Sequence, residues 1–284
     1  MTSLNSSTPM KALRQVSILV LAAILGLTFA LSAPGDERES QVTARDLASR
    51  LSALQQNRVS FIRLRLEING ATKETLQLQI KERRTTNVSD VVYQVLYPKE
   101  RKGESVLLRK VGNNRATGSV FAPPDTVRPI GDLKEPLLGS DLSYEDAIEN
   151  FFAWEQQAIV GNEKVDTVNC VILESKPGKG EHSIYGSVRS WIDVRRLVPL
   201  RIQKHSGSGE LLRRIDTTRV VADAGHHIPA DLTVSGVRPD SSTLLDGSRI
   251  EHKVIYTERD FTTEGLKELT APRRSDEYET RTPR

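Results

Sequence analysis

The side chains best equipped for chemistry are five histidines, one cysteine and a short run of carboxylates. His226 and His227 are adjacent, so in an extended strand their imidazoles point to opposite faces and cannot share a ligand. His182, His205 and His252 stand apart, and the sequence holds no HExxH or CxxC motif. We therefore expect no metal site and treat these histidines as solvated loop residues.

Cys170 alternates with Val168 and Ile172, a spacing that predicts a strand with one buried face. A lone cysteine in such a strand is a small buried hydrophobe more often than a nucleophile. The sequence also contains no GxSxG elbow, phosphate-binding loop or GxGxxG fingerprint. We expect no enzymatic activity and no cofactor.

The carboxylates lie in the stretch from Gly139 to Asp146, which joins two long β-rich halves. Gly139 can adopt the positive φ of a tight turn, and Ser140 and Asp141 follow it. Ser143 fits a helix N-cap with Asp146 as its capping-box partner three residues later. Capping explains these acidic residues better than acid/base catalysis does. The same pattern predicts a short helix through Ala147, Ile148, Phe151 and Phe152.

Most elements that would position these residues are strands. Residues 43–56 predict an amphipathic helix with a Thr43–Asp46 capping box. From residue 58 the apolar period changes from 3.6 to 2, and alternating segments with turn residues between them continue to residue 261. Residues 123–138 contain four prolines and predict an irregular loop, and residues 249–261 predict the last strand.

These segments predict a mainly β fold. We expect a single curled antiparallel sheet, an open half-barrel of about eleven strands, with a few short covering helices. The domain should span residues 33–271. The charged stretch 272–284 has almost no aliphatic residue and predicts a disordered tail.

The N-terminus predicts export. Lys11 and Arg14 precede the apolar run from Val16 to Leu31, and Ala30-Leu31-Ser32 offers a cleavage site, so residues 1–32 fit a signal peptide. The alternative is an uncleaved helix that anchors the protein to the inner membrane. Without the leader, the chain has 38 basic and 37 acidic side chains. That balance argues against nucleic-acid binding and against electrostatic capture of cargo.

A series of short motifs, in this order, resembles the LolA-like outer-membrane lipoprotein-sorting family over about residues 45–269. The motifs are Tyr97-Pro98, Gly103 before Val106-Leu107-Leu108, Gly139-Ser140-Asp141 with Tyr144-Glu145-Asp146, Cys170-Val171-Ile172-Leu173 leading to Lys176-Pro177, Trp191-Ile192-Asp193 followed by Pro199-Leu200, Gly209-Glu210-Leu211-Leu212, Ile228-Pro229 and Phe261-Thr262. The resemblance implies an open, half-closed barrel whose helices cover a hydrophobic cavity for acyl chains. It also implies a periplasmic location and an inner-membrane transporter as a partner.

Three functions remain open from the sequence. The first is a non-catalytic carrier or chaperone for lipid or lipoprotein, and the second is an adaptor that docks on an envelope transporter or outer-membrane complex. The third is an enzyme with an unrecognised site. For the carrier we expect an apolar cavity of roughly 300–1,000 Å³. Its candidate lining is aromatic, although core packing is the alternative for the two tryptophans: Phe61, Tyr93, Phe151, Phe152, Trp154 and Trp191.

Overall fold

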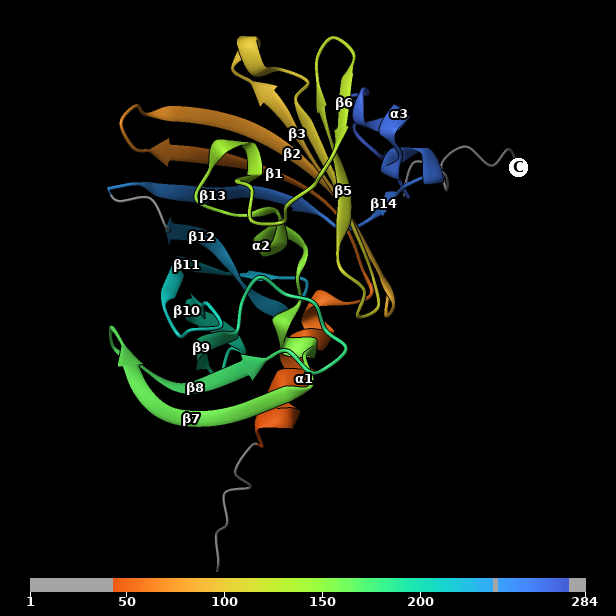
Figure 1. Cartoon of the computed structure of the whole chain (residues 1–284). Coiled ribbons are helices and arrows are strands. Elements are labelled where there is room, and N and C mark those ends of the chain that lie inside the picture. The colour runs from red at the N-terminus through yellow and green to blue at the C-terminus, as the bar shows by residue number, and fades with distance from the viewer. Residues whose placement is uncertain (1–42, 237–239, 276–284) are drawn as a thin grey trace, which may run out of the picture. The chain divides into compact units, whose positions relative to one another are not determined.

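A single antiparallel sheet forms the frame of the molecule (Figure 1). The computed structural model describes residues 43–236 and 240–275, and the predicted signal peptide lies outside them. The described residues all belong to one compact unit. Within the described residues, the first six strands of the sheet are β1 (Arg58–Asn69), β2 (Glu74–Arg84), β3 (Val88–Tyr97), β4 (Ser105–Val111), β5 (Thr117–Ala122) and β6 (Thr126–Pro129). The other seven are β7 (Gln156–Val165), β8 (Val168–Lys176), β9 (Ser187–Asp193), β10 (Val198–His205), β11 (Leu211–Asp223), β12 (His226–Ser235) and β13 (Ser242–Glu251).

The sheet is built from two meanders that meet in its middle. Its strand order is β6-β5-β4-β3-β2-β1-β13-β12-β11-β10-β9-β8-β7, so every pair except β1–β13 joins strands that are consecutive in the sequence. The edges are β6 and β7, and the sheet does not close. The prediction of one open antiparallel sheet is confirmed, with thirteen strands in the described residues instead of about eleven.

The differences in strand boundaries have local causes. The proline-rich loop contains the edge strand β6 and the single turn η2 (Leu137–Gly139). The predicted last strand ends at Glu251, and Thr257 then starts η4 (Glu258–Phe261) through a capping box with Asp260. Arg273 and Arg274 form β15, which pairs with β14 (Val254–Ile255), inside the stretch whose composition predicts disorder. Residues 276–284 of that stretch lie outside the described residues.

The first hairpin has the register that its alternation predicts. Ile62 pairs with Ile80, Leu64 with Leu78, and Leu66 with Leu76, so the six side chains share one face of β1 and β2. This is the inner face of the sheet, and Leu66, Leu76 and Leu78 are buried in its core.

Two segments cover the inner face. The crossing segment (residues 130–155) contains η2, α2 (Tyr144–Ile148) and η3 (Phe151–Ala153), and Figure 1 shows the sheet curling around α2. Its apolar side chains fill the space over the strands on both sides of the β1–β13 pair. Helix α1 (Ala44–Gln55) packs on the β8–β10 region together with η3. The predicted cap of α1 is confirmed, because Thr43 accepts a hydrogen bond from the Asp46 amide.

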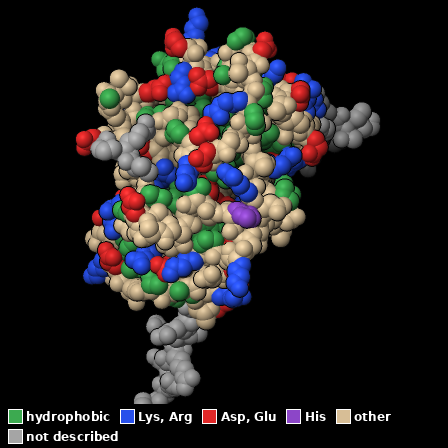
Figure 2. Space-filling model, viewed as in Figure 1, with side chains coloured by type: hydrophobic (Ala, Val, Ile, Leu, Met, Phe, Trp, Pro, Cys, Tyr) green, Lys and Arg blue, Asp and Glu red, His purple; other side chains and the backbone are tan. Residues whose placement is uncertain are grey.

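The outer face of the sheet is partly covered by the C-terminal segment. The C-terminal strap (residues 252–275) contains η4 and α3 (Thr263–Leu266) and lies across β3–β5. Phe261 and Leu266 pack there against Val92 from β3. The strap also buries Lys81, whose ammonium lies 2.9 Å from Asp260. Figure 2 shows basic, acidic and hydrophobic side chains mixed over one face of the molecule. In the described chain, no helix is long and apolar enough to cross a membrane.

Candidate functional site

The crossing segment is fastened at the turn that the sequence singled out. Gly139 has a φ of 85°, as predicted. Ser143 caps α2 by accepting from the Asp146 amide, and the Asp146 carboxylate accepts from the Ser143 amide at 2.7 Å. The predicted capping box is therefore confirmed. The helix ends at Ile148, earlier than predicted, because Glu149 turns to extended geometry and binds Lys110 and the Trp154 indole.

Asp146 also joins a buried charge cluster. Its carboxylate contacts the Lys204 ammonium at 2.7 Å and the Arg213 guanidinium, and it accepts a 2.8 Å hydrogen bond from the Tyr185 hydroxyl. Burial would raise the pKa of Asp146, but Lys204 and Arg213 outweigh it and lower the pKa to about 2. Burial and the Asp146 charge raise the pKa of Tyr185, which keeps its hydroxyl a donor. Asp146 thus ties α2 to β10 and β11.

The other two acidic residues of the stretch make similar connections. Glu145 accepts hydrogen bonds from the Ser183 hydroxyl and the Ile184 amide, and burial raises its pKa. Asp141 accepts from the hydroxyls of Thr243 and Ser241, at 2.8 Å and 2.5 Å. The three carboxylates accept hydrogen bonds from different partners, so each holds the crossing segment to a different part of the chain.

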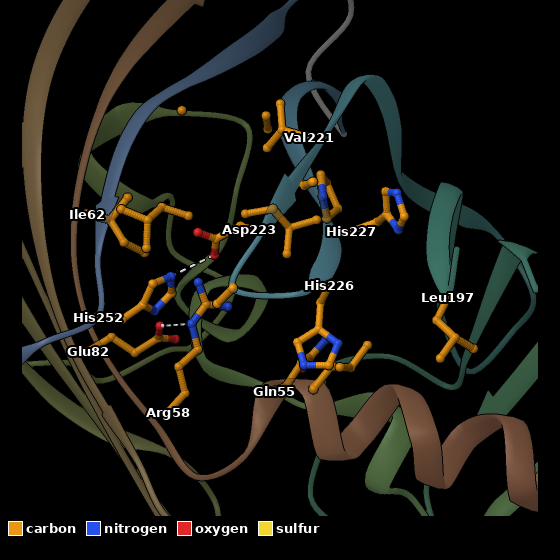
Figure 3. A pocket seen from close by; sticks show the side chains of 18 of the residues that line it. Gln55, Arg58, Ile62, Glu82, Leu197, Val221, Asp223, His226, His227 and His252 are labelled. Carbon is orange, nitrogen blue, oxygen red and sulfur yellow. Dashed lines mark hydrogen bonds and ion pairs between the residues drawn. The ribbon is translucent and has the colours of Figure 1, made fainter. Parts of the chain in front are cut away.

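A cavity of about 950 Å³ lies beyond the part of the inner face that the crossing segment fills. Its walls are the C-terminal end of α1, the inner faces of β1 and β2, and strands β11–β13 (Figure 3). Ile62 and Leu64 border it and are only half-buried, whereas Leu66 and Ile68, farther along the same face, are buried in the filled core. The half-exposed apolar side chains therefore mark where the core stops and the cavity begins. Its apolar lining includes Leu51, Leu54, Ile62, Leu64, Ile80, Phe152, Val221, Ile228, Leu232, Leu245 and Ile250.

Strand register separates this lining into an apolar end and a polar end. Leu66 pairs with Leu245, and Leu245 pairs with Leu232, which places an apolar rung across three strands. Toward the start of β1 the lining changes to Arg58, with Glu82 on β2. The opposite walls change in the same direction, and end in Asp223, His226, His227 and His252.

Ion pairs organise the polar end. The Glu82 carboxylate accepts from Arg84 at 2.6 Å and from the Ser60 hydroxyl at 2.7 Å, and lies 3.3 Å from Arg58 Nε. Burial would raise the pKa of Glu82, but Arg84 and Arg58 outweigh it, so the pKa is lowered and the carboxylate stays charged. His252 Nε2 lies 2.7 Å from Asp223, as the dashed line in Figure 3 shows.

The six aromatic residues predicted to contact a ligand lie in different places. Phe152 lines the cavity, and Phe151 and Trp154 pack beside it in the α1 cluster, so the structure brings these three together. Tyr93 packs against the filled core and donates a hydrogen bond to the Ala147 carbonyl. Contact between a ligand and any of these aromatic residues remains a prediction.

The last two, Phe61 and Trp191, occupy the opposite side of the sheet. Phe61 alternates with the cavity-lining Ile62, and Trp191 packs with Cys170 in a separate cluster. Trp191 lies in β9, whereas Trp154 follows η3 and precedes β7. Cys170 is buried, and burial raises its pKa.

The sequence did not predict the polar end of the cavity. His226, His227 and His252 read as separate loop histidines, although each lies at or next to a strand end. A signal was available, since Arg58 and Glu82 occupy the inner face that Ile62 and Ile80 share. In the described residues, no three His, Cys, Asp or Glu side chains group to hold a metal ion.

Comparisons with known proteins establish the fold. A family model described as an uncharacterized protein matches residues 88–268, and no curated protein matches the sequence. A DUF1329 family protein from Desulfovibrio piger superposes with a TM-score of 0.73 at 21% identity, covering 78% of this chain and 97% of that one. A putative outer membrane lipoprotein-sorting protein domain from Vibrio parahaemolyticus gives 0.71 at 18%, covering 79% and 98%. A LolA superfamily protein from Nitrosomonas europaea gives 0.64 at 17%, covering 79% and 99%. The resemblance to the LolA-like family is confirmed as a likeness of fold.

Proposed function

Because the chain belongs to the uncharacterized-protein family whose model spans residues 88–268, and because its fold is that of LolA-like proteins, we propose that it is a non-catalytic carrier of lipid or lipoprotein acyl chains. The cavity beside α1 would hold the acyl chain. The observation that carries this proposal is an open volume of about 950 Å³ bordered by apolar side chains that stay half-exposed.

The size and lining of the cavity support this cargo. Its volume lies at the upper end of the range of about 300–1,000 Å³ that small-molecule sites occupy. Burial of an acyl chain contributes about 0.8 kcal/mol per methylene, so a long chain binds an apolar wall without a specific contact. Ile62 and Leu64 on β1, Leu245 on β13 and Leu232 on β12 form an apolar strip across three adjacent strands for such a chain.

The crossing segment supports a preformed site. Its acidic residues are tied to β10, β11 and β13, so it fills one part of the curl as a fixed wall. The cavity therefore needs no movement of α2 to form. A cargo would enter beside α1, where the lining reaches the ends of β1, β12 and β13.

The compartment belongs to the same proposal. We place the carrier in the periplasm on the basis of the predicted leader at residues 1–32 and of the lipoprotein-sorting name of the Vibrio neighbour. Retention of that leader would make it a carrier tethered to the inner membrane. N-terminal sequencing of the exported protein distinguishes the two.

Binding of a fluorescent fatty-acid probe tests the carrier, with two neighbouring leucines as a matched pair. Leu245 borders the cavity, whereas Leu244 points outward and is 39% exposed. Leu245→Asp should abolish probe binding, and Leu244→Asp should leave it unchanged. Leu54→Trp, on α1, should weaken binding by filling the space without adding charge. Circular dichroism verifies that all three variants fold.

Mass spectrometry of protein purified gently from its own cell envelope provides the independent arm. A co-purifying lipid or lipoprotein supports the carrier. If wild type binds no probe and co-purifies only with a protein partner, the carrier proposal is wrong, and the adaptor for an envelope transporter replaces it.

A further inference from the structure

Resting on the carrier proposal, we propose that the cargo is an amphiphile with an anionic end, and that Arg58 binds its carboxylate or phosphate at the polar end of the cavity. The acyl chain would extend toward Leu232 and Leu245. The structure supports this orientation through three independent features: the register of the lining, the pairing of its charges, and the exposure of Arg58.

The register sets the direction of the ligand. Arg58, Ile62 and Leu64 lie on the same strand and all line the cavity. At about 3.3 Å per residue, Arg58 is about 20 Å from Leu64 along β1. The lining therefore passes from a cation to apolar side chains over a distance comparable with a long acyl chain. A uniformly apolar ligand would leave the charged end without a partner.

The pairing of the lining charges indicates which sign of charge a ligand would have to carry. Both lining carboxylates have close partners: Glu82 is held by Arg84 and Ser60, and Asp223 by His252. Two of the lining arginines are paired in the same way, Arg219 with Asp231 at 2.6 Å and Arg249 with Glu251 at 3.1 Å.

Arg58 is different. In the part of the chain that the structure describes, its only ion pair is the 3.3 Å approach of Nε to Glu82, whose oxygens also accept from Arg84 and Ser60. Within residues 43–236 and 240–275, no hydrogen bond engages the Nη donors of Arg58 or the rings of His226 and His227. Figure 3 shows the Arg58 side chain extending from below toward Asp223 and His252.

The chemistry of these free donors specifies the ligand. A guanidinium presents its two Nη groups as a planar fork that matches a carboxylate or a phosphate. The Arg58 side chain is 25% exposed, so a bound anion would be partly shielded from water and held more strongly than at a surface. His226 and His227 also line this end of the cavity, but they are neighbours on β12 and their side chains point in different directions, so the proposal rests on Arg58.

This inference revises the expectation from overall charge. The near balance of basic and acidic side chains indicated that cargo capture does not depend on electrostatics. That balance describes the whole surface, whereas the fold places one incompletely paired arginine at the end of an apolar cavity. A single local cation is sufficient for head-group selection, because charge-assisted hydrogen bonds are short-range interactions.

Affinities for three ligands of equal chain length test the proposal: laurate, dodecyl phosphate and dodecanol, measured by displacement of the fluorescent probe. In wild type, both anions should bind at least about tenfold more tightly than dodecanol, the difference expected for one hydrogen-bonded charge. Arg58→Gln should remove that preference. Its affinity for dodecanol should stay within about twofold of the wild-type affinity, because dodecanol makes no charged contact for the substitution to remove. Arg58→Lys should restore part of it.

Arg65→Gln is the matched control, since Arg65 lies on the outer face of β1 and pairs with Asp246. It should change none of the three affinities. Equal binding of laurate and dodecanol to wild type, or equal weakening of both by Arg58→Gln, overturns the head-group assignment but does not contradict the carrier proposal. Displacement of the probe by acetate or inorganic phosphate at the concentrations where laurate acts would show a small-anion site and also overturn it. Failure of all three ligands to bind removes the carrier proposal itself.

Discussion

Replacement of Asp146 by asparagine should destabilise the protein strongly while changing its shape little. The carboxylate is fully buried and faces Lys204 and Arg213, whose side chains are 3% and 9% exposed. Asparagine keeps one acceptor for the Ser143 cap but leaves two buried cations without a counter-charge. Loss of one partner from such a cluster costs about 3–5 kcal/mol. The depression of the Asp146 pKa from 3.8 to about 2 accounts for roughly 2 kcal/mol of that figure.

Urea unfolding followed by circular dichroism measures the effect, and thermal unfolding should show a midpoint lower by roughly 6–20 °C. Asp231→Asn is the control, because its pair with Arg219 is exposed and contributes less than about 1 kcal/mol. A folded-state pKa below the unfolded value stabilises the protein above about pH 4, and that contribution is lost as the pH falls through about 2. The gap between wild type and Asp146→Asn should therefore narrow on acidification. Two results would refute the conclusion that Asp146 holds α2 to β10 and β11. One is a free energy of unfolding within about 1 kcal/mol of wild type at neutral pH, and the other is a difference in that free energy that does not change with pH.

Three further predictions concern the core, the strap and an edge strand. Leu66→Asp buries a carboxylate in the filled core and should cost several kcal/mol in urea unfolding, whereas Leu64→Asp borders the cavity and should cost less than half as much. Equal costs would mean that no water reaches the cavity wall. Lys81→Met leaves the Asp260 carboxylate without its 2.9 Å partner, and limited proteolysis should then cleave residues 253–268 faster than in wild type. An unchanged cleavage rate would show that apolar packing alone holds the strap. Gly118→Ala should lower stability by about 1–3 kcal/mol, because its Cβ would overlap a backbone carbonyl of β4. A neutral effect would mean that β5 can shift to accommodate it.

Local chemistry made the first hairpin and the helix caps predictable. Alternation assigns Ile62, Leu64 and Leu66 to one face whatever their partners are, and the structure keeps that assignment. The caps at Thr43 and Ser143 depend only on residues three positions away, so they were also accessible from the sequence.

The cavity was not predictable, because it depends on which apolar residues lack a tertiary neighbour. Alternation gives Leu64 and Leu66 the same pattern, yet one borders open space and the other lies under the crossing segment. The same limit explains Phe61, whose aromatic character suggested a ligand contact although its register turns it to the outer face. Long-range contacts also ended α2 early, since Lys110 from β4 holds Glu149.

The meeting of the two meanders at β1 and β13 has a consequence for how the chain assembles. Each meander pairs strands that follow one another, but Arg65 and Asp246 across the central pair are 181 residues apart. Closing so long a loop costs more conformational entropy than forming any hairpin, so we expect this pair to form last. Until β13 has been synthesised, β1 is an unpaired edge with apolar side chains on its inner face. Nascent and truncated chains that lack β13 would therefore present a strand available for pairing with other chains.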